Sequence, residues 1–346
     1  AWTGVDLFFV LSGFLIGGIL IDARKSENYF QVFYVRRFFR IVPIYAAVLV
    51  SVAILGFLAR LWHPGTYAWL NDVRPLPWYS YWTLTQNFWM ARSNTSGLMV
   101  LAVTWSLAIE EQFYLTLPVM IRFLSKRALM VFVLSGIFLA PILRTLILVY
   151  WPDNILAGYV LMPCRADALL LGVLVAILLR EQGNWERLSR DTRYFGVAMI
   201  VLSSGVAYLA WRSSLFFSQL MQTIGYTWVS LFYATVLLFV LTHSESVLSA
   251  ILRNKALRWL GGLAYCTYLI HQTVLGFVVG PVWGQLFITS GARFMAVLSA
   301  LAITLLLANL SWKFLELPLI RKGHRFNYRE PEEHSGAAEV TMETKR

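Results

Sequence analysis

The feature that most constrains this chain is a succession of apolar segments, each long enough to cross a lipid bilayer. A helix needs about 20 apolar residues to cross the hydrocarbon core, and nine segments reach or approach that length. Only 14% of the residues are charged, whereas a soluble domain carries about 25%. The sequence therefore predicts an all-α fold, a polytopic membrane helix bundle with nine spanning helices at about 4–21, 41–61, 105–124, 129–150, 164–180, 194–211, 224–242, 260–280 and 293–313.

The apolar segments follow one another without a long polar insertion, so we predict a single transmembrane domain over residues 1–323. The chain turns polar from His324, and we expect 324–346 to be a disordered cytoplasmic tail. The first apolar segment begins almost at Ala1, without the basic region and cleavage site of a signal peptide. We therefore expect a tenth helix upstream of this sequence.

Cysteine and histidine give no sign of a disulfide framework or a metal centre. Cys164 and Cys266 each lie inside an apolar segment, and the five histidines do not recur at the spacing of a ligand pair. The sequence predicts no metal site.

Basic residues predict the orientation in the membrane. Most lysines and arginines fall in one set of alternate loops and at the C-terminal end. The positive-inside rule places that side in the cytoplasm, so we expect a bacterial inner-membrane protein with a cytoplasmic C-terminus. On this interpretation the net charge of +11 reflects topology and contact with anionic lipid, and not nucleic-acid binding.

Ionisable side chains inside apolar spans are costly and mark candidate functional residues. With the orientation above, most of these side chains fall in the outer half of the membrane, where we expect them to converge. The candidates are Asp6, Glu110, Glu111, Arg165, Asp167 and His271.

Glu110 and Glu111 are adjacent, so their side chains point about 100° apart on one helix. One carboxylate can then face a cavity while the other pairs with an arginine, for which Arg165 is a candidate. Two interpretations stay open: a catalytic pair of carboxylates, or an ion pair that only holds helices together. For His271, packing and catalysis are likewise both open.

The stretch YFQVFYVRRFFRIVPIY interleaves aromatic residues with Arg36, Arg37 and Arg40, as in a helix that lies in the membrane interface. These arginines either anchor the cytoplasmic side or bind phosphate groups through their planar forks of donors. A second aromatic stretch, 62–105, is expected outside the membrane. It forms either an interfacial aromatic belt or a platform for sugar rings.

Six motifs together resemble the membrane acyltransferase-3 family, whose members O-acylate sugars. The motifs run in the family's order from Gly4 to about Lys322 and cover nearly the whole chain. Ala108 stands where a common form of the third motif has a second serine. The six are GVDLFFVLSGFLIG, YVRRFFRIVPIY, TWSLAIEEQFYL, CRADALLLG, YCTYLIHQ and WKFLELP.

The resemblance implies a ten-helix membrane O-acyltransferase that moves an acyl group, expected to be acetyl, from cytoplasmic acyl-CoA to a hydroxyl of an envelope glycan or glycolipid. It assigns the donor to Arg36, Arg37 and Arg40, with no bound cofactor. It places a catalytic histidine on the helix that we expect upstream. We therefore expect the chain as written to be inactive and a chain extended upstream to be active.

Within this scheme, Glu111 and Glu110 orient the base, while Arg165 and Asp167 hold the cavity or the acceptor. Two other classes remain open. A permease for a lipid-linked sugar or small anion would also use buried carboxylates and an arginine. A sensor or assembly subunit without chemistry would tolerate the loss of Glu111.

Overall fold

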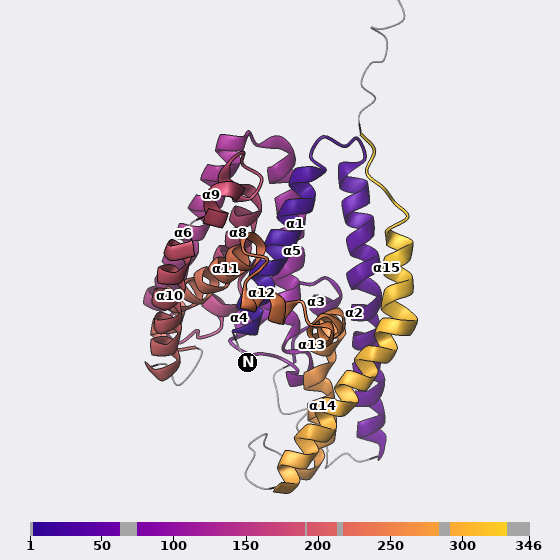
Figure 1. Ribbon diagram of the computed structural model, residues 1–346. Coiled ribbons are helices and arrows are strands. Elements are labelled where there is room, and N and C mark those ends of the chain that lie inside the picture. The colour runs from indigo at the N-terminus through magenta and orange to yellow at the C-terminus, as the bar shows by residue number, and fades with distance from the viewer. Residues whose placement is uncertain (1–2, 63–74, 191, 213–216, 284–290, 331–346) are drawn as a thin grey trace, which may run out of the picture.

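The computed structural model describes residues 3–62, 75–190, 192–212, 217–283 and 291–330, and within these ranges the chain is helical without strands (Figure 1). The all-α prediction is thus confirmed. The long helices are α1 (Gly4–Asp22), α2 (Tyr29–Trp62), α5 (Thr104–Phe123), α6 (Lys126–Tyr150), α8 (Met162–Leu178), α10 (Thr192–Arg212), α11 (Tyr226–Thr242), α13 (Lys255–Trp283) and α14 (Gly291–Ser311). The short ones are α3 (Trp78–Trp82), α4 (Gln86–Ser93), η2 (Met99–Leu101), α7 (Ala157–Val160), α9 (Asn184–Arg190), η3 (Met221–Gly225), α12 (Val247–Leu252), η4 (Trp312–Glu316) and α15 (Leu317–Gly323).

Within the described residues, eight helical segments are long and apolar enough to cross a membrane, and each overlaps one of the predicted spans. The remaining predicted span, 105–124, forms the 20-residue helix α5. This helix is missing from those eight segments, since Glu110, Glu111 and Arg122 lower its hydropathy. Most of its side chains are buried against other helices, so α5 is largely shielded from lipid.

One local prediction was wrong. The arginine-rich stretch is not a separate interfacial helix, because α2 runs continuously from Tyr29 to Trp62. Pro43 lies inside this helix without ending it, which membrane helices tolerate. Arg36, Arg37 and Arg40 therefore lie along the first turns of a spanning helix.

Helices α1 and α8 pack closely through glycines. A Cβ at Gly13 would collide with the backbone of Leu169, and one at Gly172 would collide with the backbone of Val10. Small residues let membrane helices approach closely, and Gly13 and Gly172 do so here. This contact sets the positions of Asp6 on α1 and Arg165 on α8.

The bundle has two parts, seen in Figure 1 as α1, α5, α6, α8, α10 and α11 on one side and α2, α14 and α15 on the other. Tyrosines join them: Tyr29 Oη donates to the carbonyl of Pro118 at 3.1 Å, and Tyr45 Oη donates to that of Tyr81 at 2.8 Å. Helix α13 is tied to α5 through Tyr268, as described below. The glutamates of α5 face Arg37 of α2 across this boundary.

Residues 324–330, the beginning of the predicted tail, lie against the α1–α2 connection. Asn28 Nδ2 donates to the carbonyl of Asn327 at 2.9 Å, and the Arg329 amide donates to Asn28 Oδ1 at 2.9 Å. Arg36 Nε donates to the carbonyl of Phe326 at 2.9 Å. The rest of the predicted tail, 331–346, lies outside the described residues.

The aromatic stretch falls partly outside the described residues, since 63–74 are not included. Of the remainder, Tyr81 and Trp105 are buried. Trp78, Tyr79 and Trp82 are about half exposed. The exposed rings fit a membrane belt and a sugar platform equally well.

Candidate active site

Glu110 lies at the centre of a buried network of hydroxyl groups. Ser12 Oγ on α1 donates to Glu110 Oε1 at 2.5 Å, and Tyr114 Oη donates to the same oxygen. The Ser12 and Tyr114 hydroxyl oxygens are 2.6 Å apart. Glu110 is only 5% exposed. The Glu110 carboxyl group is therefore hydrogen-bonded by two hydroxyl groups, and it forms no salt bridge with a described residue.

Glu111 differs from its neighbour, because its buried Oε1 atom has no hydrogen-bond partner. The positive charge of Arg37 on α2 acts on both carboxyl groups. The Arg37 guanidinium lies 5.4 Å from the centroid of the Tyr114 ring. Glu111 thus keeps a buried oxygen without a partner, whereas both hydroxyl bonds to Glu110 reach its Oε1 atom.

The predicted pairing of a glutamate with Arg165 was wrong. Arg165 Nη2 instead bonds Asp6 Oδ1 at 2.5 Å, and both side chains are 1% exposed. The close packing of α1 on α8 at Gly13 brings these two residues together. A sequence cannot show this preference, because Asp6 and Arg165 are far apart along the chain.

Aromatic rings surround the guanidinium of Arg165. Its Cζ lies 4.2 Å from the ring centroid of Tyr226, 5.5 Å from that of Tyr159 and 5.9 Å from that of Phe9. Two of its buried nitrogens, Nε and Nη1, have no hydrogen-bond partner. Arg165 therefore combines a firmly held charge with two unused donors.

A second buried ion pair lies beside the first and involves Arg144, which was not among the predicted site residues. Arg144 lies inside α6, is fully buried and donates to Asp167 Oδ2 at 3.0 Å. It also donates to Thr227 Oγ1 and to the carbonyl of Gln222, both at 2.6 Å. A further bond reaches the carbonyl of Cys164. The apolar residues around Arg144 in APILRTLILV were the signal that should have marked it as buried.

The predicted convergence is partly confirmed. Asp6, Arg165 and Asp167 meet in one cluster together with Arg144, and the two aspartates balance the two arginines. The glutamates form a separate group deeper in the bundle. The two groups are linked through α1, which carries both Asp6 and Ser12.

His271 joins neither group directly. Its Nδ1 atom lies 2.7 Å from the carbonyl oxygen of Tyr268. A carbonyl only accepts, so Nδ1 carries the proton and Nε2 of a neutral ring is an acceptor. Tyr268 Oη in turn lies 2.7 Å from Ser106 Oγ on α5. His271 is thus connected to the α5 helix that carries both glutamates, and its Nε2 has the form required of a general base.

The three arginines on α2 do not form one clamp. Arg36 is engaged by the segment 324–330, also through Nη2 to Asn327 Oδ1 at 3.1 Å, and Arg37 lies over Tyr114. Arg40 is exposed and has no hydrogen bond or ion pair with a described residue. Arg40 is therefore the arginine most available to an anionic ligand. Across the described residues no cluster of His, Cys, Asp and Glu could hold a metal ion.

The helices and their buried charges agree with the comparisons to known proteins. A family model described as "Acyltransferase domain" matches residues 3–312, and the chain belongs to this family. The resemblance inferred from the six motifs is confirmed.

The chain is similar to the peptidoglycan O-acetyltransferase OatA of Listeria monocytogenes, with 31% identity over 94% of this chain and 52% of the relative. It is also similar to the O-acetyltransferase OatA of Staphylococcus aureus, with 27% identity over 94% of this chain and 53% of the relative. The chain thus spans about half the length of these curated relatives. No solved structure matches it.

Proposed function

We propose that this chain is the membrane part of an O-acetyltransferase that moves an acetyl group from cytoplasmic acetyl-CoA to a hydroxyl of a cell-wall glycan. The family supports acyl transfer, and the relatives' names support acetyl as the group and peptidoglycan as the acceptor. The observation that carries the proposal is the adjacent pair Glu110–Glu111, on which the charge of Arg37 acts, with the buried Oε1 atom of Glu111 unpartnered.

The donor side is the N-terminal, arginine-rich end of α2. Arginine binds phosphate through a planar fork of donors, and Arg37 and Arg40 are not engaged by carboxylates among the described residues. Arg36 is held at this end of α2 by its hydrogen bond to the carbonyl of Phe326 in the segment 324–330. In this proposal the basic side of the bundle, and with it residue 330, faces the cytoplasm.

The chemical step needs a general base. The base takes the proton of the glycan hydroxyl, the hydroxyl oxygen attacks the thioester carbonyl, and the carbon–sulfur bond breaks to release CoA, whose sulfur takes up a proton. Such a base typically raises the rate of the reaction by about 10²–10⁴-fold. Family resemblance assigns this role to a histidine upstream, and within the chain His271 is the candidate because its Nε2 is an acceptor. Glu111 orients the base or stabilises its charged form.

Charge develops on the carbonyl oxygen during the attack and requires hydrogen-bond donors. The unused Nε and Nη1 of Arg165 are such donors. Asp6 keeps Arg165 in place through the 2.5 Å ion pair. Asp167 belongs to the supporting cluster and is held by Arg144.

The test uses membrane vesicles that contain the native envelope glycan. Labelled acetyl-CoA is supplied to the cytoplasmic face, and label is measured in the glycan as a base-labile ester. Both the 346-residue chain and a version extended upstream are assayed. Variants Arg37→Ala and Glu111→Ala are compared with Arg187→Ala, which alters an exposed arginine of α9.

Ester formation that is lost in Arg37→Ala and Glu111→Ala but retained in Arg187→Ala supports the proposal. Transport of a substrate across the membrane without ester formation would favour a permease instead. Activity that is unchanged in Glu111→Ala would remove the glutamates from the mechanism.

A further inference from the structure

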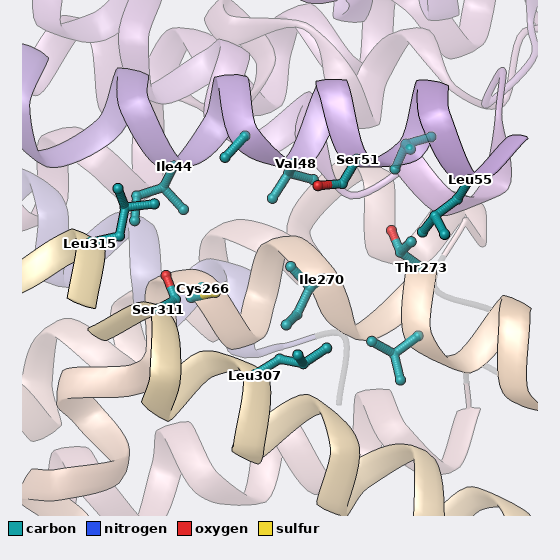
Figure 2. A pocket seen from close by; sticks show the side chains of 13 residues that line it. Ile44, Val48, Ser51, Leu55, Cys266, Ile270, Thr273, Leu307, Ser311 and Leu315 are labelled. Carbon is teal, nitrogen blue, oxygen red and sulfur yellow. The ribbon is translucent and has the colours of Figure 1, made fainter. Parts of the chain in front are cut away.

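An apolar groove runs along α2 on the side that faces α13 and α14. Figure 2 shows Ile44, Val48 and Leu55 of α2 opposite Ile270 of α13 and Leu307 of α14. The groove has a volume of about 290 Å³. Ile44 and Val48 are only 2% and 7% exposed, so the floor of the groove is recessed.

The dimensions of the groove suit one alkyl chain. From Ile44 to Leu55 the groove covers about 16 Å, at about 1.5 Å per helical residue. An extended alkyl chain can lie along this length against apolar side chains of α2, α13 and α14. In a bilayer an unfilled apolar groove forfeits van der Waals contacts along its walls, so a lipid chain is the occupant that the walls favour.

A positive charge stands at one end of the groove. Arg40 precedes Ile44 and Val48 at four-residue spacing, so the three share one face of α2. Its guanidinium is exposed and has no hydrogen bond or ion pair with a described residue. Lys322 on α15 adds a second cation close by, with Nζ 5.5 Å from the ring centroid of Phe39.

Two carboxyl groups interact electrostatically with Arg40. One is that of Glu316, whose Oε1 atom accepts a hydrogen bond from Ser311 Oγ at 3.0 Å. The other is that of Glu110, on which Arg37 acts more strongly than Arg40. Neither forms a salt bridge with Arg40 among the described residues, so the guanidinium keeps its donors for a ligand. A chain lying along Ile44 would place its headgroup about one helical turn away, at the level of Arg40.

We propose that this groove binds one acyl chain of an anionic phospholipid, whose phosphate is held by Arg40. The groove itself is lined by neither glutamate, but Arg40 is shared with the proposed donor face, so binding of lipid is measured without coenzyme A. A bound lipid accounts for both the recessed apolar floor and the unpaired cation at its end. Each basic residue near a membrane surface attracts anionic lipid by an amount that corresponds to about fivefold in affinity.

The test measures lipids retained by the intact chain after purification without coenzyme A. The protein is exchanged into detergent with equal amounts of phosphatidylglycerol and phosphatidylethanolamine, and bound lipid is counted by native mass spectrometry. We expect one retained phosphatidylglycerol, preferred by about fivefold. Val48→Trp, which fills the groove, abolishes retention, and Arg40→Gln removes the preference for phosphatidylglycerol.

The matched control is Val50→Trp, on a face of α2 where the side chain is 46% exposed, and it retains the lipid. Ser51→Phe is a second groove-filling variant at an exposed position, for use if Val48→Trp does not fold. Equal retention of both lipids, or retention that neither filling variant reduces, would overturn the proposal. So would a folded protein that retains no lipid.

Discussion

Removing the guanidinium of Arg144 tests the claim that the buried charges form one balanced cluster. In Arg144→Met the apolar stem is kept, but the fully buried carboxylate of Asp167 loses its counter-charge. Only two neutral donors remain to it, Thr227 Oγ1 at 2.6 Å and the Ala168 amide at 3.0 Å. Breaking a buried pair from one side costs about 3–5 kcal/mol, and the carbonyls of Gln222 and Cys164 lose their donor as well.

The double variant Arg144→Met, Asp167→Asn separates the charge effect from the packing effect. It restores neutrality, since the Asp6–Arg165 pair is unchanged, and we expect it to be more stable than Arg144→Met alone. The free energy of unfolding is measured in mixed micelles at rising SDS fraction, with Arg187→Met as the exposed control. The reasoning is refuted if the free energy of unfolding of Arg144→Met lies within about 0.5 kcal/mol of that of the control. It is equally refuted if adding Asp167→Asn to Arg144→Met lowers the free energy of unfolding further.

Three further predictions concern packing and chemistry. Gly13→Leu forces α1 away from the Leu169 backbone and lowers the free energy of unfolding by about 3 kcal/mol or more in the same assay; a smaller loss would mean that the two helices separate easily. Tyr114→Phe removes a hydroxyl donor to Glu110 and costs about 1–3 kcal/mol, with reduced ester formation; unchanged stability would argue against the network. His271→Gln keeps a donor for the Tyr268 carbonyl but cannot act as a base. In the extended chain, where the upstream histidine is the expected base, we expect ester formation to be retained; a fall in kcat of about 10²-fold or more with KM nearly unchanged would instead assign the base to His271.

The sequence was sufficient to predict the helices, because a membrane span depends on the local composition of about 20 residues. The helix α5 was predicted despite its low hydropathy, because the segment 105–124 has the length of a membrane span.

Partners were much harder to predict than helices. Arg165 could have paired with any of several carboxylates, and the choice of Asp6 depends on how α1 packs on α8. Arg144 lies inside the predicted span 129–150 and inside α6, but it was not among the predicted site residues, because its carboxylate partner is on another helix. The contacts of Arg36 with 324–330 were unforeseeable, since that segment is polar and has no periodic pattern.

The balanced charge of the Asp6–Arg165 and Arg144–Asp167 pairs has a consequence for a protein in an energised membrane. Moving one elementary charge through 100 mV requires about 2.3 kcal/mol. Two aspartates and two arginines sum to zero, so moving the cluster as a whole across the membrane potential requires no electrical work. The field still acts in opposite directions on Asp6 of α1 and Arg144 of α6, and the ion pairs that join both residues to α8 resist this separation.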